Sequence, residues 1–389
     1  MFWDLLSRAA GAVDLTVPYF LTSGLMCDGW GDVDDDTDQL LAHEMRERGT
    51  GMFPDIKELT FADGSKPHDE TRIGSFTSPC ATWLPQESQT GYVMIVSPPA
   101  TKGPVRGVVV LVAPISDEGF TFRHRLVAAP LARQGFVSLI LQSPFFGRRQ
   151  LNGQKNFFMR TANMMLLQIP TVSIEAAKLV KYARLAFPGV PLGLAGMSVG
   201  GCSAASAFPS AVKEIQSIDG SGESTPLVLC GFVPPSQCSI LFSSRFSRLF
   251  DYGALTLDRP GYRTVEDVKA RLAERFQTHD ATTCFDLLRG QDFCPSPRLT
   301  FSLLCAKHDY VVVREDTMRL YEAGRAVIAD IRLRFLSGGH LSNIAQTSQI
   351  MPHAIVESFQ APDPSFTNAA AVAEKVQDDS QQLSPRSRL

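Results

Sequence analysis

Short apolar runs alternate with longer stretches of helical spacing along most of the chain. Continuous apolar runs are typical of strands that are buried on both faces of a parallel sheet. The pattern predicts strands over 72–77, 91–96, 107–112, 136–141, 190–195, 226–233, 299–306 and 331–336. It predicts helices over 121–134, 162–187, 314–329 and 348–359. Strand, helix and strand in succession form a right-handed βαβ crossover. We therefore expect an α/β fold with a mostly parallel central sheet flanked by helices.

The strand and helix rhythm is interrupted between residues 235 and 298 and resumes at Leu299. Within this interval, Thr264-Val265-Glu266-Asp267 is typical of a capped helix start, and the helix is predicted to run to about Thr278. We therefore expect residues 235–298 to form a helical cap inserted into a core made of residues 71–234 and 299–360.

The two ends of the chain lack the pattern of the core. Residues 1–70 are expected to form a helical extension with an amphipathic helix from Phe2 to about Asp14, which packs on the core or lies on a membrane surface. The same segment lacks the features of a secretory signal, and no stretch is long enough for a membrane span. Residues 361–389 have no apolar periodicity, which predicts a disordered tail.

Composition narrows the classes of partner. The chain has 389 residues and a formal net charge of −3, and it contains no basic block, so nucleic acid is not an expected partner. Its 8 cysteines include no C-x-x-C, and Cys202, Cys230 and Cys305 lie in apolar runs. We expect buried thiols in an intracellular protein, with no structural zinc, no other metal and no cofactor.

The segment Gly196-Met197-Ser198-Val199-Gly200 lies between a predicted buried strand and a helix rich in small residues. A serine at a sharp strand-to-helix turn takes a strained backbone conformation, and the glycines two residues before and after it avoid side-chain collisions. The hydroxyl is then exposed above the carboxyl ends of the strands. We therefore predict that Ser198 is a nucleophile.

A serine hydroxyl needs a base within hydrogen-bond reach and an acid to orient that base. His340 is the one histidine that follows a late strand on a short glycine loop. Asp309 stands just beyond the preceding strand, 299–306, and leaves room for one helix and one strand before His340. Ser198, Asp309 and His340 are therefore the predicted catalytic residues.

The negative oxygen that forms during ester cleavage needs backbone donors. Val199 N–H, at the start of the helix, is the first predicted donor. The second is expected from the loop after strand 107–112, but Pro114 has no N–H. Ile115 or Ser116 is therefore the predicted second donor.

Several motifs together resemble a known family. They are GWG at 29–31, Ser78-Pro79, FRHR at 122–125, SPFFGRR at 143–149, GMSVGG, AKHDYVV and LSGGHLS. In this order they resemble the abhydrolase domain-containing protein 18 family, from about residue 5 to 359. The resemblance implies an α/β-hydrolase fold, a serine hydrolase with a lipid or ester substrate, and the triad Ser198, Asp309 and His340. The chain departs from the family in the loop of Pro114, Ile115 and Glu118.

The expected reaction is cleavage of an acyl ester, with a lipid or phospholipid as the substrate, through an acyl-enzyme on Ser198. Apolar cap residues either receive an acyl chain or form the core of the cap; they are Leu241, Phe242, Phe246, Leu249 and Phe250. Candidate headgroup-binding residues are Arg123, Arg125, Arg148 and Arg149. The alternatives are an acyltransferase that uses the same triad and a non-catalytic scaffold.

The chain ends in Ser387-Arg388-Leu389, a variant of the peroxisomal S-K-L signal. This ending predicts recognition by a peroxisomal import receptor, with a mitochondrial or cytosolic location as the alternative.

Overall fold

The computed structural model is described here over ten parts of the chain: residues 7, 25–31, 37–61, 70–115, 117–155, 159–219, 225–236, 245–259, 261–289 and 298–360. Several predictions fall outside these residues: the helix of Phe2 to Asp14 except Ser7, the donor Ser116, the cap residues Leu241 and Phe242, and the tail 361–389 with its last three residues. None of the described helices has the length and apolar character needed to cross a bilayer.

A single nine-stranded sheet runs through the described residues, in the order β1-β2-β3-β5-β4-β6-β7-β8-β9. Neighbouring strands are parallel from β5 to β9, and β1, β2 and β3 are antiparallel to their neighbours. The strands are β1 (Thr60–Phe61), β2 (Thr71–Thr77), β3 (Thr90–Val96), β4 (Gly107–Val112), β5 (Phe136–Gln142), β6 (Leu192–Met197), β7 (Leu227–Phe232), β8 (Leu299–Ala306) and β9 (Asp330–Leu336). The predicted mostly parallel sheet is confirmed.

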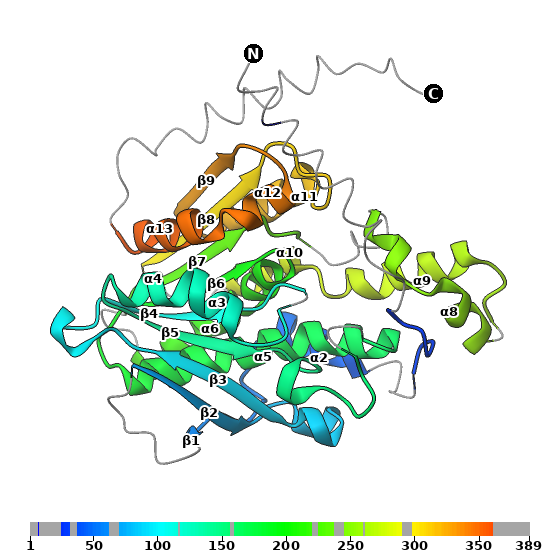
Figure 1. Cartoon of the computed structure of the whole chain (residues 1–389), viewed down its shortest axis with the longest axis horizontal. Coiled ribbons are helices and arrows are strands. Elements are labelled where there is room, and N and C mark those ends of the chain that lie inside the picture. The colour runs from blue at the N-terminus through cyan, green and yellow to red at the C-terminus, as the bar shows by residue number, and fades with distance from the viewer. Residues whose placement is uncertain are drawn as a thin grey trace. The chain divides into compact units, whose positions relative to one another are not determined.

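Helices flank the sheet (Figure 1). They are α2 (Thr37–Glu47), α3 (Thr121–Arg123), α4 (Ala129–Ala132), α5 (Ala162–Ala186), α6 (Val199–Asp219), α8 (Tyr252–Asp258), α9 (Val265–Gln277), α10 (Ala281–Cys284), α11 (Arg314–Arg325), α12 (His340–Ala345) and α13 (Thr347–Phe359). Helix α5 packs against α6 and α2, whereas α13 packs against α4 and the turn before it.

The predicted helix over 121–134 is interrupted. A π-helical turn from His124 to Ala128 separates α3 from α4. The turn lies directly before Pro130, which has no N–H to donate to the carbonyl four residues earlier. Short π turns of this kind are often found near functional sites. Arg123 stands at the junction and is buried.

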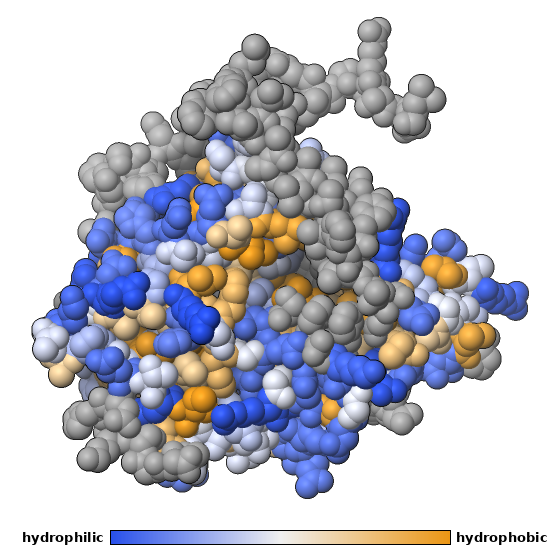
Figure 2. Space-filling model, in the orientation of Figure 1, coloured by the Kyte–Doolittle hydropathy of each residue, from blue (hydrophilic) through white to orange (hydrophobic). Residues whose placement is uncertain are grey.

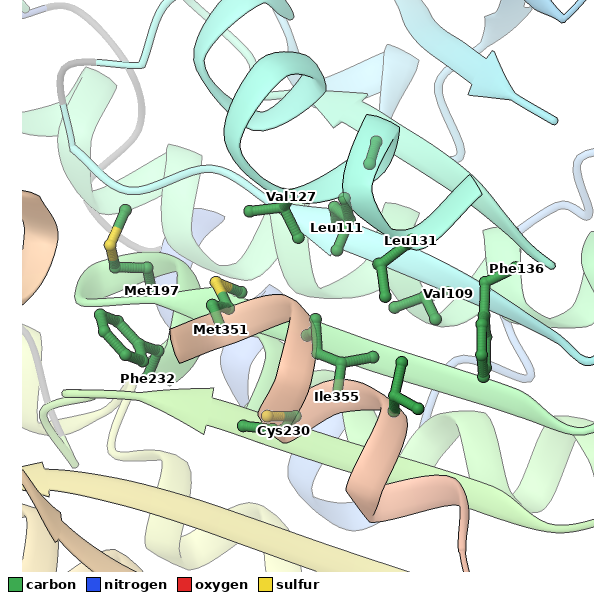
Figure 3. Packing of buried hydrophobic residues seen from close by; sticks show 14 of the residues in the cluster. Val109, Leu111, Val127, Leu131, Phe136, Met197, Cys230, Phe232, Met351 and Ile355 are labelled. Atoms are coloured by element: carbon green, nitrogen blue, oxygen red, sulfur yellow. The ribbon is translucent and has the colours of Figure 1, made fainter. Parts of the chain in front are cut away.

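Apolar side chains from β4, α4 and α13 form a core on one face of the sheet (Figure 3). Val109 and Leu111 of β4 contribute to this cluster, together with Leu131 of α4 and Ile355 of α13. Every residue of β4 is buried. Continuous apolar runs therefore mark strands covered on both faces, as the pattern predicts. Figure 2 shows a mainly hydrophilic surface on the viewed face, with apolar side chains exposed near its centre.

The interval 235–298 contains helices, as expected. Thr264 Oγ1 accepts from Asp267 N, and the Asp267 carboxylate accepts from Thr264 N, which forms the predicted cap of α9. Arg275 of α9 binds the Asp38 carboxylate of α2, and His279 Nε2 lies 3.0 Å from the same carboxylate. All three side chains are buried, so α2 and the segment from α9 to His279 share a buried polar contact.

Candidate active site

Ser198 lies on a strained turn between β6 and α6. Its φ is 53°, in the left-handed region that a non-glycine residue rarely adopts. A Cβ added at Gly196 would lie 2.1 Å from the Gly200 carbonyl oxygen, and one at Gly200 would lie 2.5 Å from the Ala113 carbonyl oxygen. Both distances are far below van der Waals contact, so only glycine fits at either position. The turn therefore has the geometry predicted from the Gly-x-Ser-x-Gly spacing.

The structure brings Ser198, His340 and Asp309 together. His340 Nε2 lies 3.0 Å from Ser198 Oγ, and His340 Nδ1 lies 2.9 Å from Asp309 Oδ2. An ionised carboxylate only accepts hydrogen bonds, so the ring proton is assigned to Nδ1. Nε2 then presents its lone pair and can accept the hydroxyl proton of Ser198. The three side chains thus form one hydrogen-bonded series, in which Ser198 precedes the other two residues by more than a hundred positions in the chain.

Short contacts fix the carboxylate of Asp309 after β8. Its Oδ1 atom accepts from Val311 N at 2.8 Å and from Val312 N at 2.7 Å. The Asp309 side chain is only 2% exposed. Two backbone donors therefore hold one carboxylate oxygen, and the other oxygen is directed at His340.

His340 is the first residue of α12, on the glycine loop that follows β9. Asn343 Nδ2 donates to Gly339 O at 2.7 Å and to Ser337 O at 3.1 Å. Ser342 Oγ accepts from Gly339 N at 2.9 Å. The loop is therefore held by side chains of the helix that it begins. Asn343 could not be identified from the sequence, because an asparagine three residues after a histidine carries no recognisable signal of its own.

A small cavity is lined by the loop after β4 and by the first residues of α6. Its lining includes Ala113, Pro114 and Ile115 from the loop after β4, with Val199 and Ser203 from α6. Its volume of about 10 Å³ is room for a group about the size of one water molecule. Val199 is the first residue of α6, so its N–H belongs to the turn that has no acceptor within the helix. The two predicted donors in the described residues, Val199 and Ile115, thus line one cavity.

The four candidate headgroup arginines differ in exposure. Arg123 and Arg149 are 3% and 0% exposed, and their guanidinium groups bind internal partners, so the prediction that they hold a headgroup is wrong. Burial lowers the pKa of the Arg123 guanidinium, and the adjacent Asp117 carboxylate opposes that shift. Arg125 and Arg148 are exposed, and the Arg148 guanidinium lies 5.4 Å from the centre of the Tyr92 ring. A headgroup role for these two stays a prediction.

Buried thiols do not compete with Ser198 as nucleophiles. Burial raises the pKa of Cys230 and of Cys305 to about 12. Such thiols are protonated at neutral pH and are therefore unreactive. Across the described parts of the chain, no cluster of three or more His, Cys, Asp or Glu side chains is arranged to hold a metal ion.

The sheet order and the strained serine turn define an α/β-hydrolase fold. The family model described as alpha/beta hydrolase domain containing 18 matches residues 23–233, more than half of the 389 residues. The chain belongs to that family, which confirms the resemblance and supports a hydrolase. The matched residues include Ser198, whereas Asp309 and His340 lie beyond them. The comparison with curated proteins returned no match.

Solved structures similar to this chain share little of its sequence. Acetyl xylan esterase 1 from Thermoanaerobacterium is 14% identical, with a TM-score of 0.44, and the alignment covers 87% of this chain and 98% of that one. XC6422 from Xanthomonas campestris, described as a serine hydrolase without a lid, is 12% identical, with a TM-score of 0.42 and coverage of 77% and 100%. TT1662 from Thermus thermophilus is 14% identical, with a TM-score of 0.44 and coverage of 70% and 94%.

Proposed function

We propose that this chain is a serine hydrolase that cleaves carboxylic esters through an acyl-enzyme on Ser198. The observation that carries the proposal is the hydrogen-bonded path from Ser198 Oγ through His340 to Asp309. An alcohol, an imidazole and a buried carboxylate in this order are the arrangement that activates a serine for acyl transfer. Membership of an α/β-hydrolase family adds support for the reaction class.

In the first half of the reaction, Ser198 Oγ attacks the carbonyl carbon of the ester and its proton passes to His340 Nε2. The carbonyl π bond opens, and the oxygen carries the negative charge in the tetrahedral intermediate. The cavity lined by Val199 and Ile115 has the size of a single oxygen, which favours it as the site of this charge. Collapse of the intermediate breaks the bond to the alkoxy group, which leaves as the alcohol with the proton from His340.

In the second half, water attacks the acyl carbon and gives a proton to His340. The acyl group leaves as a carboxylic acid, and Ser198 recovers its proton. Asp309 holds the imidazole in the required tautomer and stabilises its charged form throughout both halves.

The substrate predicted from the sequence is a lipid ester. Leu249 and Phe250 are 4% and 5% exposed, so they belong to a packed interior and do not offer a surface to an acyl chain. The lipid part of the proposal therefore depends on residues other than these two. An ester series with acyl chains from acetate to palmitate, followed by phospholipid vesicles, would determine which chain length Ser198 accepts.

A fluorophosphonate probe tests the proposal directly. The wild-type protein should be labelled on Ser198, and Ser198→Ala should not be labelled. Ser217→Ala, which changes another serine of the same helix α6, should be labelled like the wild type and serves as the control. A folded wild type that takes no label would contradict the proposal and favour a non-catalytic scaffold. Product analysis with added alcohols would distinguish hydrolysis from acyl transfer to an alcohol.

A further inference from the structure

Arg123 places a guanidinium group inside the protein at the point where β4 and β5 end. Its Nη1 atom donates to Leu111 O at 2.8 Å and to Leu141 O at 2.5 Å. Leu111 belongs to β4, and Leu141 belongs to its parallel neighbour β5. The two hydrogens on one nitrogen thus bind the carbonyls of adjacent strands close to their carboxyl ends.

The other side of the same guanidinium binds the loop that follows β4. Arg123 Nε donates to Asp117 Oδ2 at 2.6 Å, and Nη2 donates to Gly119 O at 2.9 Å. Ile115 lies between the two regions that Arg123 binds, since Leu111 precedes it and Asp117 follows it. The planar group therefore ties the start of this loop to its end, with Ile115 in the span between them.

The strained turn at Ser198, between β6 and α6, limits the same loop from the opposite direction. The Cα of Gly200 lies so close to the end of β4 that an added Cβ would be 2.5 Å from Ala113 O and 2.7 Å from Val112 O. The backbone of the loop is therefore packed against the first turn of α6, where Val199 offers its amide. Contact with α6 on one side and hydrogen bonds to Arg123 on the other leave the loop little freedom.

The loop needs such support because of its sequence. Pro114 cannot donate a hydrogen bond, and the only backbone bond described within the loop is from Asp117 N to Pro114 O at 3.3 Å, which is long. Gln142 of β5 adds one more contact, from Nε2 to Glu118 O at 2.8 Å. Side chains rather than backbone pairing therefore hold the loop in the described part of the chain.

We propose that Arg123 is a positioning residue for the oxyanion hole: it fixes the loop after β4 so that the amides of Ile115 and Val199 face the same cavity. This inference depends on the proposed function, since it concerns the charge that forms on the ester oxygen. Arg123 touches neither substrate nor the reacting atoms. Its role is to hold the backbone donors within hydrogen-bond distance of the oxyanion. A displacement of these donors by about 1 Å would weaken the hydrogen bonds and lower the rate by about a hundredfold.

Arg123→Lys is the most informative variant, because it keeps the charge beside Asp117 and removes the fork that binds four oxygens. We expect kcat for p-nitrophenyl acetate to fall about 10²-fold to 10³-fold, as after loss of an oxyanion donor, with KM changed by less than about threefold. Burst titration of active sites would correct for misfolded protein. Arg133→Lys, ten positions away and exposed, should keep the wild-type kcat.

Inhibition by a trifluoromethyl ketone is a measurement that a purely structural role of Arg123 would leave unchanged. Such a ketone forms a tetrahedral adduct with an oxyanion, so its inhibition constant should rise by the same factor as kcat/KM falls. If Arg123→Lys fails to fold, Asp117→Asn tests the same connection, since it weakens one contact of the loop and leaves Arg123 bound to the strands. The expected result is a smaller loss of kcat in the same direction.

The outcomes separate this inference from the proposed function. A wild-type protein that is neither labelled by fluorophosphonate nor active on esters contradicts the proposed function. A wild type labelled on Ser198, together with Arg123→Lys or Asp117→Asn of unchanged kcat per titrated site, overturns only the role of Arg123. A rise in KM with unchanged kcat would also overturn it, because that pattern indicates contact with the ground-state substrate.

Discussion

Two regions at the carboxyl-terminal edge of the sheet, where the candidate active site lies, are held in different ways. The triad region carries its predicted reacting side chains on short loops after β8 and β9, and most side-chain contacts described for these loops come from residues close by in the chain, such as those of Asp309 with Val311 N and of Asn343 with Gly339 O. The bond from Gly338 N to Ser7 Oγ, at 2.6 Å, is an exception. The proposed oxyanion region would offer backbone amides, and its loops after β4 and β5 are bound by the buried guanidinium groups of Arg123 and Arg149.

The difference follows from what each region must present. A side chain can be directed by its own residue and its neighbours, whereas a backbone amide points correctly only if the whole loop is held. Arg149 illustrates this in the loop 143–149, where it binds the Glu175 carboxylate with two nitrogens, at 2.8 and 2.7 Å, and also binds Gln142 O. The buried arginines of this region therefore bind and support backbone carbonyls. Only the exposed arginines are available to a ligand.

The largest expected effect is in the triad region. Asp309→Asn should lower kcat by about 10⁴-fold, because the amide no longer enforces the tautomer with the proton on Nδ1 and no longer stabilises the charged imidazole. Stability should change little, since the shape of the side chain is kept. Steady-state ester hydrolysis measures the first effect and urea unfolding the second. Asp286→Asn, an exposed carboxylate, is the control. Activity within tenfold of wild type would show that His340 does not need this partner.

Substitutions in the proposed oxyanion region should mainly lower the free energy of unfolding. Arg149→Met leaves the Glu175 carboxylate buried without its partner, and this should lower the free energy of unfolding by about 3–5 kcal/mol. Urea unfolding measures the loss. The neighbouring Arg148 is exposed, so Arg148→Met should change stability by less than about 0.5 kcal/mol. The double variant Arg149→Met/Glu175→Leu should recover much of the loss. Equal stabilities of the two single variants would remove the distinction drawn between the regions.

The contact between the two regions should show the smallest effect. Gly200→Ala adds a Cβ only 2.5 Å from Ala113 O, so the loop after β4 must shift, with a loss of about 1–3 kcal/mol in stability and slower fluorophosphonate labelling. Gly119→Ala changes a glycine of the same loop that has open space around it, and it should behave like the wild type. Labelling rates and thermal unfolding of the pair compare the two sites. Unchanged labelling of Gly200→Ala would mean that the turn between β6 and α6 does not support the loop after β4.

The triad could be located from the sequence because each of its members has a positional signal. Ser198 lies between two glycines that the turn requires, and Asp309 and His340 each follow a predicted strand. Carboxyl ends of parallel strands share one edge of the sheet, so residues at those ends meet. The oxyanion side was harder, because neither the partner of a buried arginine nor the path of a loop with a proline follows from local pattern.

What the sequence by itself determined is the order of strands and helices, the cap of α9 and the residue types that the serine turn accepts. These features depend on period, glycine placement and capping, which act over a few residues. Only the tertiary structure decided that Arg123 and Arg149 face inward and that Asn343 holds the His340 loop. Arg149 and Glu175 lie 26 positions apart, and this separation says nothing about their distance. Burial, which turns an arginine from a ligand-binding group into a support, is a property of the folded molecule.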